Sequence, residues 1–169
     1  KDGIGAALLF AELYAKRRSE RKSMFDVLDG LAREYGHYAS GQLAITMKGV
    51  DGIAKIQSVM RTLREKTIDK VGPLAVLSMT DVSKGIRVAK GETTKIPLPP
   101  SDVLFYELES KCRIIARPSG TEPKLKIYFD VREPMKKDEP LADADARAQA
   151  RMGELKAAFA AIAGLEGSV

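Results

Sequence analysis

The chain has 169 residues, of which 44% are hydrophobic and 30% are charged. This balance excludes a wholly disordered chain and allows one substantial domain with additional segments. Lysine and arginine exceed aspartate and glutamate by 28 to 23, a surplus that suits an anionic ligand without requiring a polyanionic partner. The single cysteine, Cys112, excludes an intramolecular disulfide and a cysteine-rich metal site. No apolar run reaches the roughly 20 residues of a membrane span, so we expect a cytoplasmic protein with no membrane partner.

The N-terminal segment is predicted to form two helices. Residues 6–11 and Leu13 are apolar and favour a helix, and the basic residues 16–18 follow them. Ser23 has the position of an N-cap, and Asp26 has the position of its partner in a capping box. Gly36 is predicted to end this second helix. The chain has no initiator methionine and its first residues do not form a signal peptide, which indicates a fragment of a longer protein.

The remainder of the chain mixes strand and helix patterns. An apolar stripe with helical spacing runs through residues 53–63, and a second stripe contains Met152, Leu155, Phe159 and Ile162. Strands are predicted at residues 43–47, 74–79, 103–108, 113–116 and 125–131, and an extended loop at 94–100. The last three strands follow one another with short turns. We therefore expect an α+β fold, mainly an antiparallel sheet covered by helices on one face and preceded by one or two helices.

The loop before the last predicted strand contains many groups that bind anions. Arg117 carries a planar fork of donors that fits two phosphate oxygens, and Ser119 and Thr121 add hydroxyl groups. Gly120 permits a positive φ and a close approach of the backbone, so that successive amides point into one hollow. Lys124 and Lys126 raise the local positive potential. These residues predict a phosphate site that is not a Walker loop, although the same residue types also form ordinary hairpin loops.

The eight residues from Arg117 to Lys124, Arg-Pro-Ser-Gly-Thr-Glu-Pro-Lys, resemble the phosphate-binding loop of the α-D-phosphohexomutases, the phosphoglucomutase and phosphomannomutase superfamily. Residues 98–104 and the opening Lys-Asp-Gly-Ile are also similar to segments of that family. The resemblance implies a four-domain parent protein. Residues 1–39 would be the C-terminal helices of its domain 3 and a linker, and residues 40–169 its domain 4, with a fold like that of the TATA-box-binding protein.

The resemblance also implies a function. Members of this family move a phosphoryl group between C1 and C6, or C5, of a sugar phosphate through a phosphoserine and a bisphosphorylated intermediate. They use Mg²⁺ and an activator of the glucose 1,6-bisphosphate type. Carried over by position, Arg117, Ser119, Gly120 and Thr121 would hold the non-reacting phosphate, with Lys124 assisting by charge. Lys1 matches a family lysine near the reacting centre. The implied partners are a phosphosugar and the other domains of the parent chain.

The catalytic loops of the family are absent from the sequence. These are the nucleophile loop Thr-Ala-Ser-His-Asn-Pro, the sugar-reading Gly-Glu-x-Ser-Gly and the magnesium loop Asp-x-Asp-x-Asp-Arg. Residues 143–147, Asp-Ala-Asp-Ala-Arg, imitate the last of these with one carboxylate fewer. We interpret them as the start of a helix, where Asp side chains cap backbone N–H groups. We therefore expect that this chain alone binds phosphate, holds no metal and catalyses nothing.

A second hypothesis is a basic α+β module that binds nucleic acid. It would use the cations of residues 16–22 and 124–126 and would show a steep dependence of affinity on salt. Residues 16–22 are also typical of a solvated helix end, and we expect no nucleic-acid partner. The only histidine, His37, is interpreted as a loop or helix-end residue, and Cys112 as a packed structural cysteine.

Overall fold

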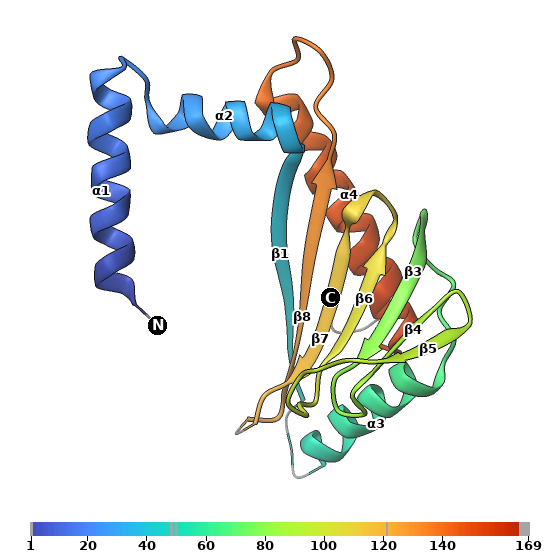
Figure 1. Ribbon diagram of the computed structural model, residues 1–169. Helices are drawn as coiled ribbons and strands as arrows, with labels where there is room; N and C mark the ends of the chain where they lie inside the picture. The colour runs from blue at the N-terminus through green and yellow to red at the C-terminus, as the bar shows by residue number, and fades with distance from the viewer. Residues whose placement is uncertain (1, 48, 50, 121, 166–169) are drawn as a thin grey trace.

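The computed structural model describes residues 2–47, 49, 51–120 and 122–165. Within them the helices are α1 (Gly3–Ser19), α2 (Met24–Tyr35), α3 (Gly52–Glu65) and α4 (Leu141–Ile162). The strands are β1 (His37–Thr46), β2 (Lys70–Val71), β3 (Leu74–Asp81), β4 (Ile86–Ala89), β5 (Glu92–Lys95), β6 (Leu104–Leu108), β7 (Arg113–Pro118) and β8 (Lys124–Glu133). They form one antiparallel sheet in the order β1-β8-β7-β6-β3-β4-β5, with β2 paired to β3 (Figure 1).

Strand β8 organises the sheet because its side chains alternate strictly between the two faces. Leu125, Ile127, Phe129 and Val131 are completely buried, whereas the residues between them are half-buried. β8 lies between β1 and β7, and it pairs with each of them along a continuous register. The strand predicted at residues 125–131 is therefore confirmed.

Helices α3 and α4 cover the face of the sheet that carries these buried residues. α3 contacts β7 and β8, and α4 contacts β1, β2 and β8 (Figure 1). Phe159 of α4 packs edge-on against Tyr106 of β6 and Phe129 of β8, with ring centroids 5.5 and 6.2 Å apart. The predicted α+β class, with an antiparallel sheet covered on one face, is confirmed.

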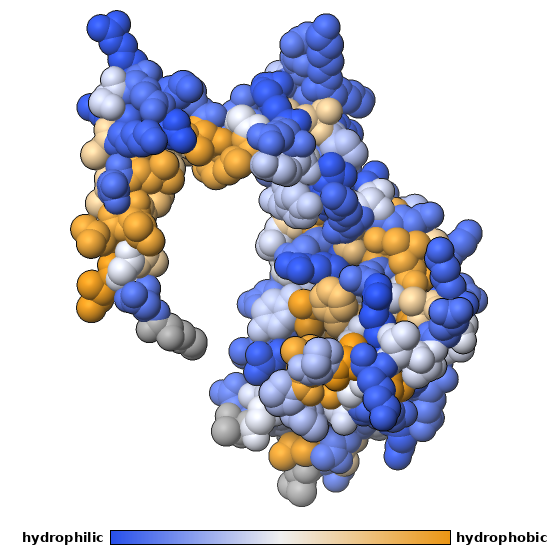
Figure 2. Space-filling view, viewed as in Figure 1, coloured by the Kyte–Doolittle hydropathy of each residue, from blue (hydrophilic) through white to orange (hydrophobic). Residues whose placement is uncertain are grey.

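Two helices precede the sheet, as expected, and they contribute little to its core. No residue of α1 is buried, and Ala32 is the only residue buried in α2. Figure 1 shows α1 standing apart from the sheet, joined to it through α2, and Figure 2 shows apolar surface along both helices.

The predicted capping box of α2 is present, since Ser23 and Asp26 exchange hydrogen bonds. Gly36 ends α2 with a φ of 95°, and a Cβ there would lie 2.8 Å from Arg132 Nε.

One strand prediction and one loop prediction differ from the structure. The strand predicted at 43–47 begins at His37, because all ten residues of β1 pair with β8; the expected boundary between residues 39 and 40 falls inside it. The loop predicted at 94–100 begins later, because residues 94–95 belong to β5. β5 is short and wholly exposed, and it pairs with β4 through a turn at Lys90 and Gly91, both with positive φ. The sequence of β5, Glu-Thr-Thr-Lys, contains no apolar residue and therefore no alternation that sequence analysis can detect.

We predict that Phe159→Ala lowers the free energy of unfolding by about 3–5 kcal/mol, because it removes a fully buried ring and leaves a cavity between α4 and the sheet. Chemical denaturation measures this change. The matched control is Leu8→Ala in α1, whose side chain is 71% exposed, and it should change the free energy by less than about 0.5 kcal/mol. Equal effects of the two substitutions would contradict the described core.

Candidate functional site

The end of the β7–β8 ladder places two cations opposite each other. Arg117 of β7 pairs directly with Lys126 of β8. The preceding pair, Ala116 and Ile127, is completely buried against the helices, so Arg117 and Lys126 lie on the uncovered face of the sheet. Like charges directly opposite each other on one face destabilise a sheet. The repulsion identifies this position as one where an anion would be bound favourably.

The same ladder carries a neutralised pair at its other end. Arg113 lies opposite Asp130 and forms an ion pair with it, and Asp130 also accepts a hydrogen bond of 2.6 Å from Ser40. These contacts, together with the neighbouring charge of Arg113, lower the pKa of Asp130 although its partial burial opposes the shift. Among the described residues, by contrast, no ion pair involves Arg117 or Lys126. Positive charge is therefore uncompensated at the end of the ladder that adjoins the predicted phosphate loop.

A cavity of about 450 Å³ opens beside this loop. One wall consists of loop residues, and the facing walls come from α3 and from the segment before β6. The lining residues are Arg117, Pro118, Ser119, Gly120, Glu122, Ile53, Ile56, Gln57, Ser101 and Asp102. Three of the predicted site residues, Arg117, Ser119 and Gly120, thus meet at one hollow. Lys124 and Lys126 are not among the lining residues, and Thr121 and Lys1 lie outside the described residues.

The backbone of the loop differs from the predicted nest of free amides. The Ser119 amide donates a 2.7 Å hydrogen bond to the Lys124 carbonyl, and the Lys124 amide donates one of 2.7 Å to the Glu122 carbonyl. The Pro123 carbonyl accepts a hydrogen bond of 2.9 Å from Met47. Two amides of the loop therefore already donate hydrogen bonds within it, and the three bonds together fix the shape of the loop beside the end of β1.

Gly120 does not use the positive φ that glycine permits, because its φ lies outside the left-handed region. A Cβ placed on Gly120 would have no heavy atom within 4 Å. Glycine therefore provides open space at the cavity wall, where an atom of a ligand can approach the main chain.

The cavity also contains two carboxylates that sequence analysis did not assign to the site. Glu122 belongs to the loop itself, and Asp102 lies on the facing wall. Asp102 forms an ion pair with Arg64, which also contacts the buried Asp81. Asp102 lies within residues 98–104, which resemble a segment of the family. That resemblance did not indicate a role for Asp102. Lys126 was missed as a direct neighbour of Arg117 because cross-strand register cannot be read from residue types.

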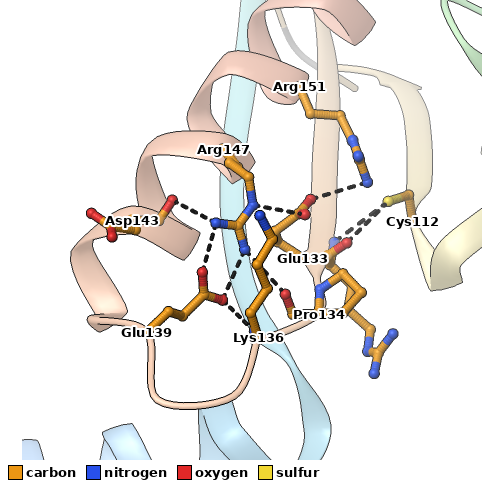
Figure 3. Close-up of polar contacts among 9 residues, drawn as sticks. Cys112, Glu133, Pro134, Lys136, Glu139, Asp143, Arg147 and Arg151 are labelled. Carbon is orange, nitrogen blue, oxygen red and sulfur yellow. Dashed lines mark hydrogen bonds and ion pairs between the residues drawn. The ribbon is translucent and has the colours of Figure 1, made fainter.

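Within residues 143–147, Asp145 and Arg147 pair with side chains outside the segment. Figure 3 shows Arg147 between Glu139 and Glu133, with its guanidinium nitrogens 2.8 and 2.9 Å from Glu139 and 3.2 Å from Glu133. The Asp145 carboxylate lies 2.8 Å from His37 Nε2, and this contact lowers the pKa of Asp145. The predicted capping role is wrong, since α4 begins after Pro140 with no side-chain cap. No group of three metal-ligating side chains occurs in the part of the chain that the structure describes.

The structure also shows where His37 and Cys112 lie. His37 is the first residue of β1 rather than a loop or helix-end residue. Cys112 is 1% exposed, and its Sγ accepts a hydrogen bond of 3.4 Å from the Arg132 amide. Burial raises the pKa of the Cys112 thiol, so the residue is the packed cysteine expected from the sequence.

The fold and cavity define an α+β domain with a basic loop at one end of an antiparallel sheet, and comparisons with known proteins identify its family. Residues 48–162 match the family model of the phosphoglucomutase/phosphomannomutase C-terminal domain. The chain is 35% identical over 147 residues to a probable phosphomannomutase of Haemophilus influenzae, covering 86% of this chain and 27% of that protein. It is 30% identical over 133 residues to a phosphoglucomutase of Staphylococcus epidermidis, covering 78% and 24% respectively.

A solved structure has the same fold. Parafusin, a phosphoglucomutase of Paramecium crystallised in an open form, superposes with a TM-score of 0.59 at 18% identity, over 99% of this chain and 28% of its own. The chain belongs to the phosphoglucomutase/phosphomannomutase family, and it contains that family's C-terminal domain. It spans about a quarter of the length of the curated relatives it matches. Among its described helices, none has the length and apolar character needed to cross a bilayer.

The Glu139–Arg147 pair predicts a pH-dependent contribution to stability. The Arg147 guanidinium lowers the pKa of Glu139 from 4.5 to about 2. The stabilisation is therefore complete above about pH 4.5 and is lost as the pH falls toward 2. Melting temperatures of the wild type and of Glu139→Gln should differ at pH 6 and converge near pH 2, with circular dichroism confirming a folded state at each pH. A difference that does not change with pH would contradict the pairing.

Proposed function

We propose that this chain is the phosphate-clamping C-terminal part of a phosphohexomutase, the class of enzyme that moves a phosphoryl group between C1 and C6, or C5, of a sugar phosphate. The observation that carries the proposal is the cross-strand pair of Arg117 and Lys126 beside a cavity lined by Ser119 and Gly120. The substrate would place its non-reacting phosphate there. Membership of the family supports the reaction class.

Electrostatics explains why this position would hold a phosphate. A dianion between two uncompensated cations removes their mutual repulsion and gains charge-assisted hydrogen bonds, each contributing about 1.5–3 kcal/mol. The guanidinium of Arg117 can donate to two phosphate oxygens in parallel. The hydroxyl of Ser119 adds a further donor at the cavity. The roles of Thr121, Lys124 and Lys1 rest on the resemblance of their positions to the family motifs.

The clamp would orient the substrate, and the rest of the parent would perform the chemistry. The sequence contains none of the family's nucleophile, sugar-reading or magnesium loops, so phosphoryl transfer, Mg²⁺ and a bisphosphate activator would belong to other domains. Holding a substrate in a reactive geometry contributes several kcal/mol to the lowering of a barrier. Alone, in this proposal, the chain binds a phosphosugar without transforming it, and the parent works in the cytoplasm.

The two N-terminal helices fit a role as the end of a preceding domain. Ile4, Leu8, Leu9 and Phe10 are all more than half exposed on α1, which is unusual for a set of large apolar side chains on one helix. In the proposed parent they pack against the rest of domain 3. Residues 1–36 would then be a domain 3 terminus and linker, and the expected division at residues 39 and 40 moves to the start of β1 at His37, where domain 4 would begin.

We predict that glucose 6-phosphate shifts the amide resonances of residues 117–126 in this chain and that Arg117→Ala abolishes these shifts. The matched control is Arg113→Ala, which removes a cation of the same strand that is already paired with Asp130; its shifts should match those of the wild type. An oligonucleotide should produce no comparable shifts. Salt-sensitive binding of the oligonucleotide, with no response to the phosphosugar, would instead support the nucleic-acid module.

In the full-length parent, Arg117→Ala should raise KM strongly and lower kcat, because the clamp binds the ground state and orients the transition state. Steady-state kinetics with a glucose or mannose phosphate measures both constants. Wild-type kinetics in this variant would refute the proposed clamp.

We predict that Leu9→Glu leaves the free energy of unfolding of this chain unchanged within about 0.5 kcal/mol, because its side chain is 67% exposed here. In the full-length parent the same substitution should destabilise the protein by about 2 kcal/mol or more, since it buries an unpaired charge. Denaturation of both proteins compares the two values, with Glu12→Gln on the same helix as control. A neutral effect in the parent would contradict the proposed packing of α1.

A further inference from the structure

Arg64 connects three parts of the structure behind the cavity. It lies in the last turn of α3, the helix whose residues Ile53, Ile56 and Gln57 line the cavity. Its Nε atom is 3.2 Å from Asp81 at the end of β3, and its NH2 nitrogen contacts Asp102 before β6. One guanidinium therefore joins the helical wall, the sheet and the wall formed by Ser101 and Asp102.

The two carboxylates that Arg64 binds differ in their surroundings. Asp81 is 1% exposed and also accepts hydrogen bonds of 3.0 Å and 2.6 Å from the amide and hydroxyl of Ser83. Asp102 is 46% exposed and lines the cavity together with Arg117. Asp81 is thus the fixed anchor of Arg64, and Asp102 is the group whose charge faces the space that a ligand would occupy.

A carboxylate in a phosphate cavity requires an explanation, because it repels the ligand. Like charges repel each other across the cavity, and the repulsion grows as a ligand excludes solvent. Asp102 faces the loop from the opposite wall, and its charge is balanced by a guanidinium that is itself only 18% exposed. The wall is further shaped by a 2.8 Å hydrogen bond from the Val103 amide to the Ser101 carbonyl.

We propose that Arg64 is a positioning residue of the phosphate cavity: through its bridge between Asp81 and Asp102 it fixes the Ser101–Asp102 wall and cancels the negative charge that Asp102 would present to a phosphorylated ligand. The inference rests on the proposed phosphate clamp and adds to it. Arg64 does not touch the ligand. It lies outside the cavity lining and balances the charge of Asp102, which leaves Arg117 and Glu122 as the other charged residues of the lining.

The test is a titration of this chain with inorganic phosphate at constant ionic strength, followed by the amide resonances of residues 117–126. Arg64→Met should weaken phosphate binding about tenfold, because Asp102 is then uncompensated. Arg64→Met combined with Asp102→Asn should recover affinity to within about threefold of the wild type. A merely structural role of Arg64 would show no such recovery. The control Arg33→Met removes an exposed Arg–Asp pair of α2 and should leave affinity unchanged.

Asp102→Asn alone keeps the Arg64–Asp81 contact, so it tests the proposal even if Arg64→Met fails to fold. It should tighten phosphate binding about two- to fivefold, because Arg64 then adds net positive charge to the cavity. Unchanged or weaker binding in Asp102→Asn, unchanged binding in Arg64→Met, or no recovery in the double variant would each overturn the inference while leaving the clamp intact. Absence of any phosphate response in the wild type at residues 117–126 would overturn the clamp itself.

Discussion

The register between β7 and β8 is the constraint on which the site depends. Leu125, Ile127 and Phe129 must face the helices, and a shift of one residue would turn all of them toward solvent. The cost of exposing a strand of large apolar side chains sets this register firmly. The same register puts Arg117 opposite Lys126. The core thus stabilises an arrangement of two like charges that has no stabilising role of its own in the sheet.

The cavity belongs to the folded domain and not to the loop alone. Its walls come from the loop after β7, from α3 and from the segment before β6. α3 packs against the sheet through Ile56, Met60 and Leu63, so the hydrophobic core also determines how far the helical wall lies from the loop. A peptide with the loop sequence would keep its charges but would lack the facing walls. The site therefore depends both on the charges of the loop and on the packing that positions the facing walls.

Most of the fold could be predicted because the strongest patterns in the sequence correspond to the most buried elements. The alternation in β8, the stripe in α3 and the capping box of α2 are each determined by residues close in sequence. The full length of β1 could not be predicted, since its pairing with the distant strand β8 forms it, and β5 could not be predicted because its four residues are polar and exposed.

Part of the candidate site could likewise be predicted from the sequence, and part of it could not. Arg117, Ser119 and Gly120 could be predicted from a contiguous motif, and they lie together. The partnership of Arg117 with Lys126, and that of Arg64 with Asp102, depends on tertiary contacts between residues far apart in sequence. Gly120 does not adopt the positive φ that glycine permits, since residue type allows a backbone conformation without requiring it.

The burial of Cys112 has a practical consequence for spectroscopy. The only sulfhydryl of the chain lies inside the core with a raised pKa, and thiolate is the form that alkylating reagents attack. A second cysteine introduced at the rim of the cavity would therefore react selectively in the native protein. A fluorophore or spin label attached there would report on the cavity without a background signal from the natural sulfur.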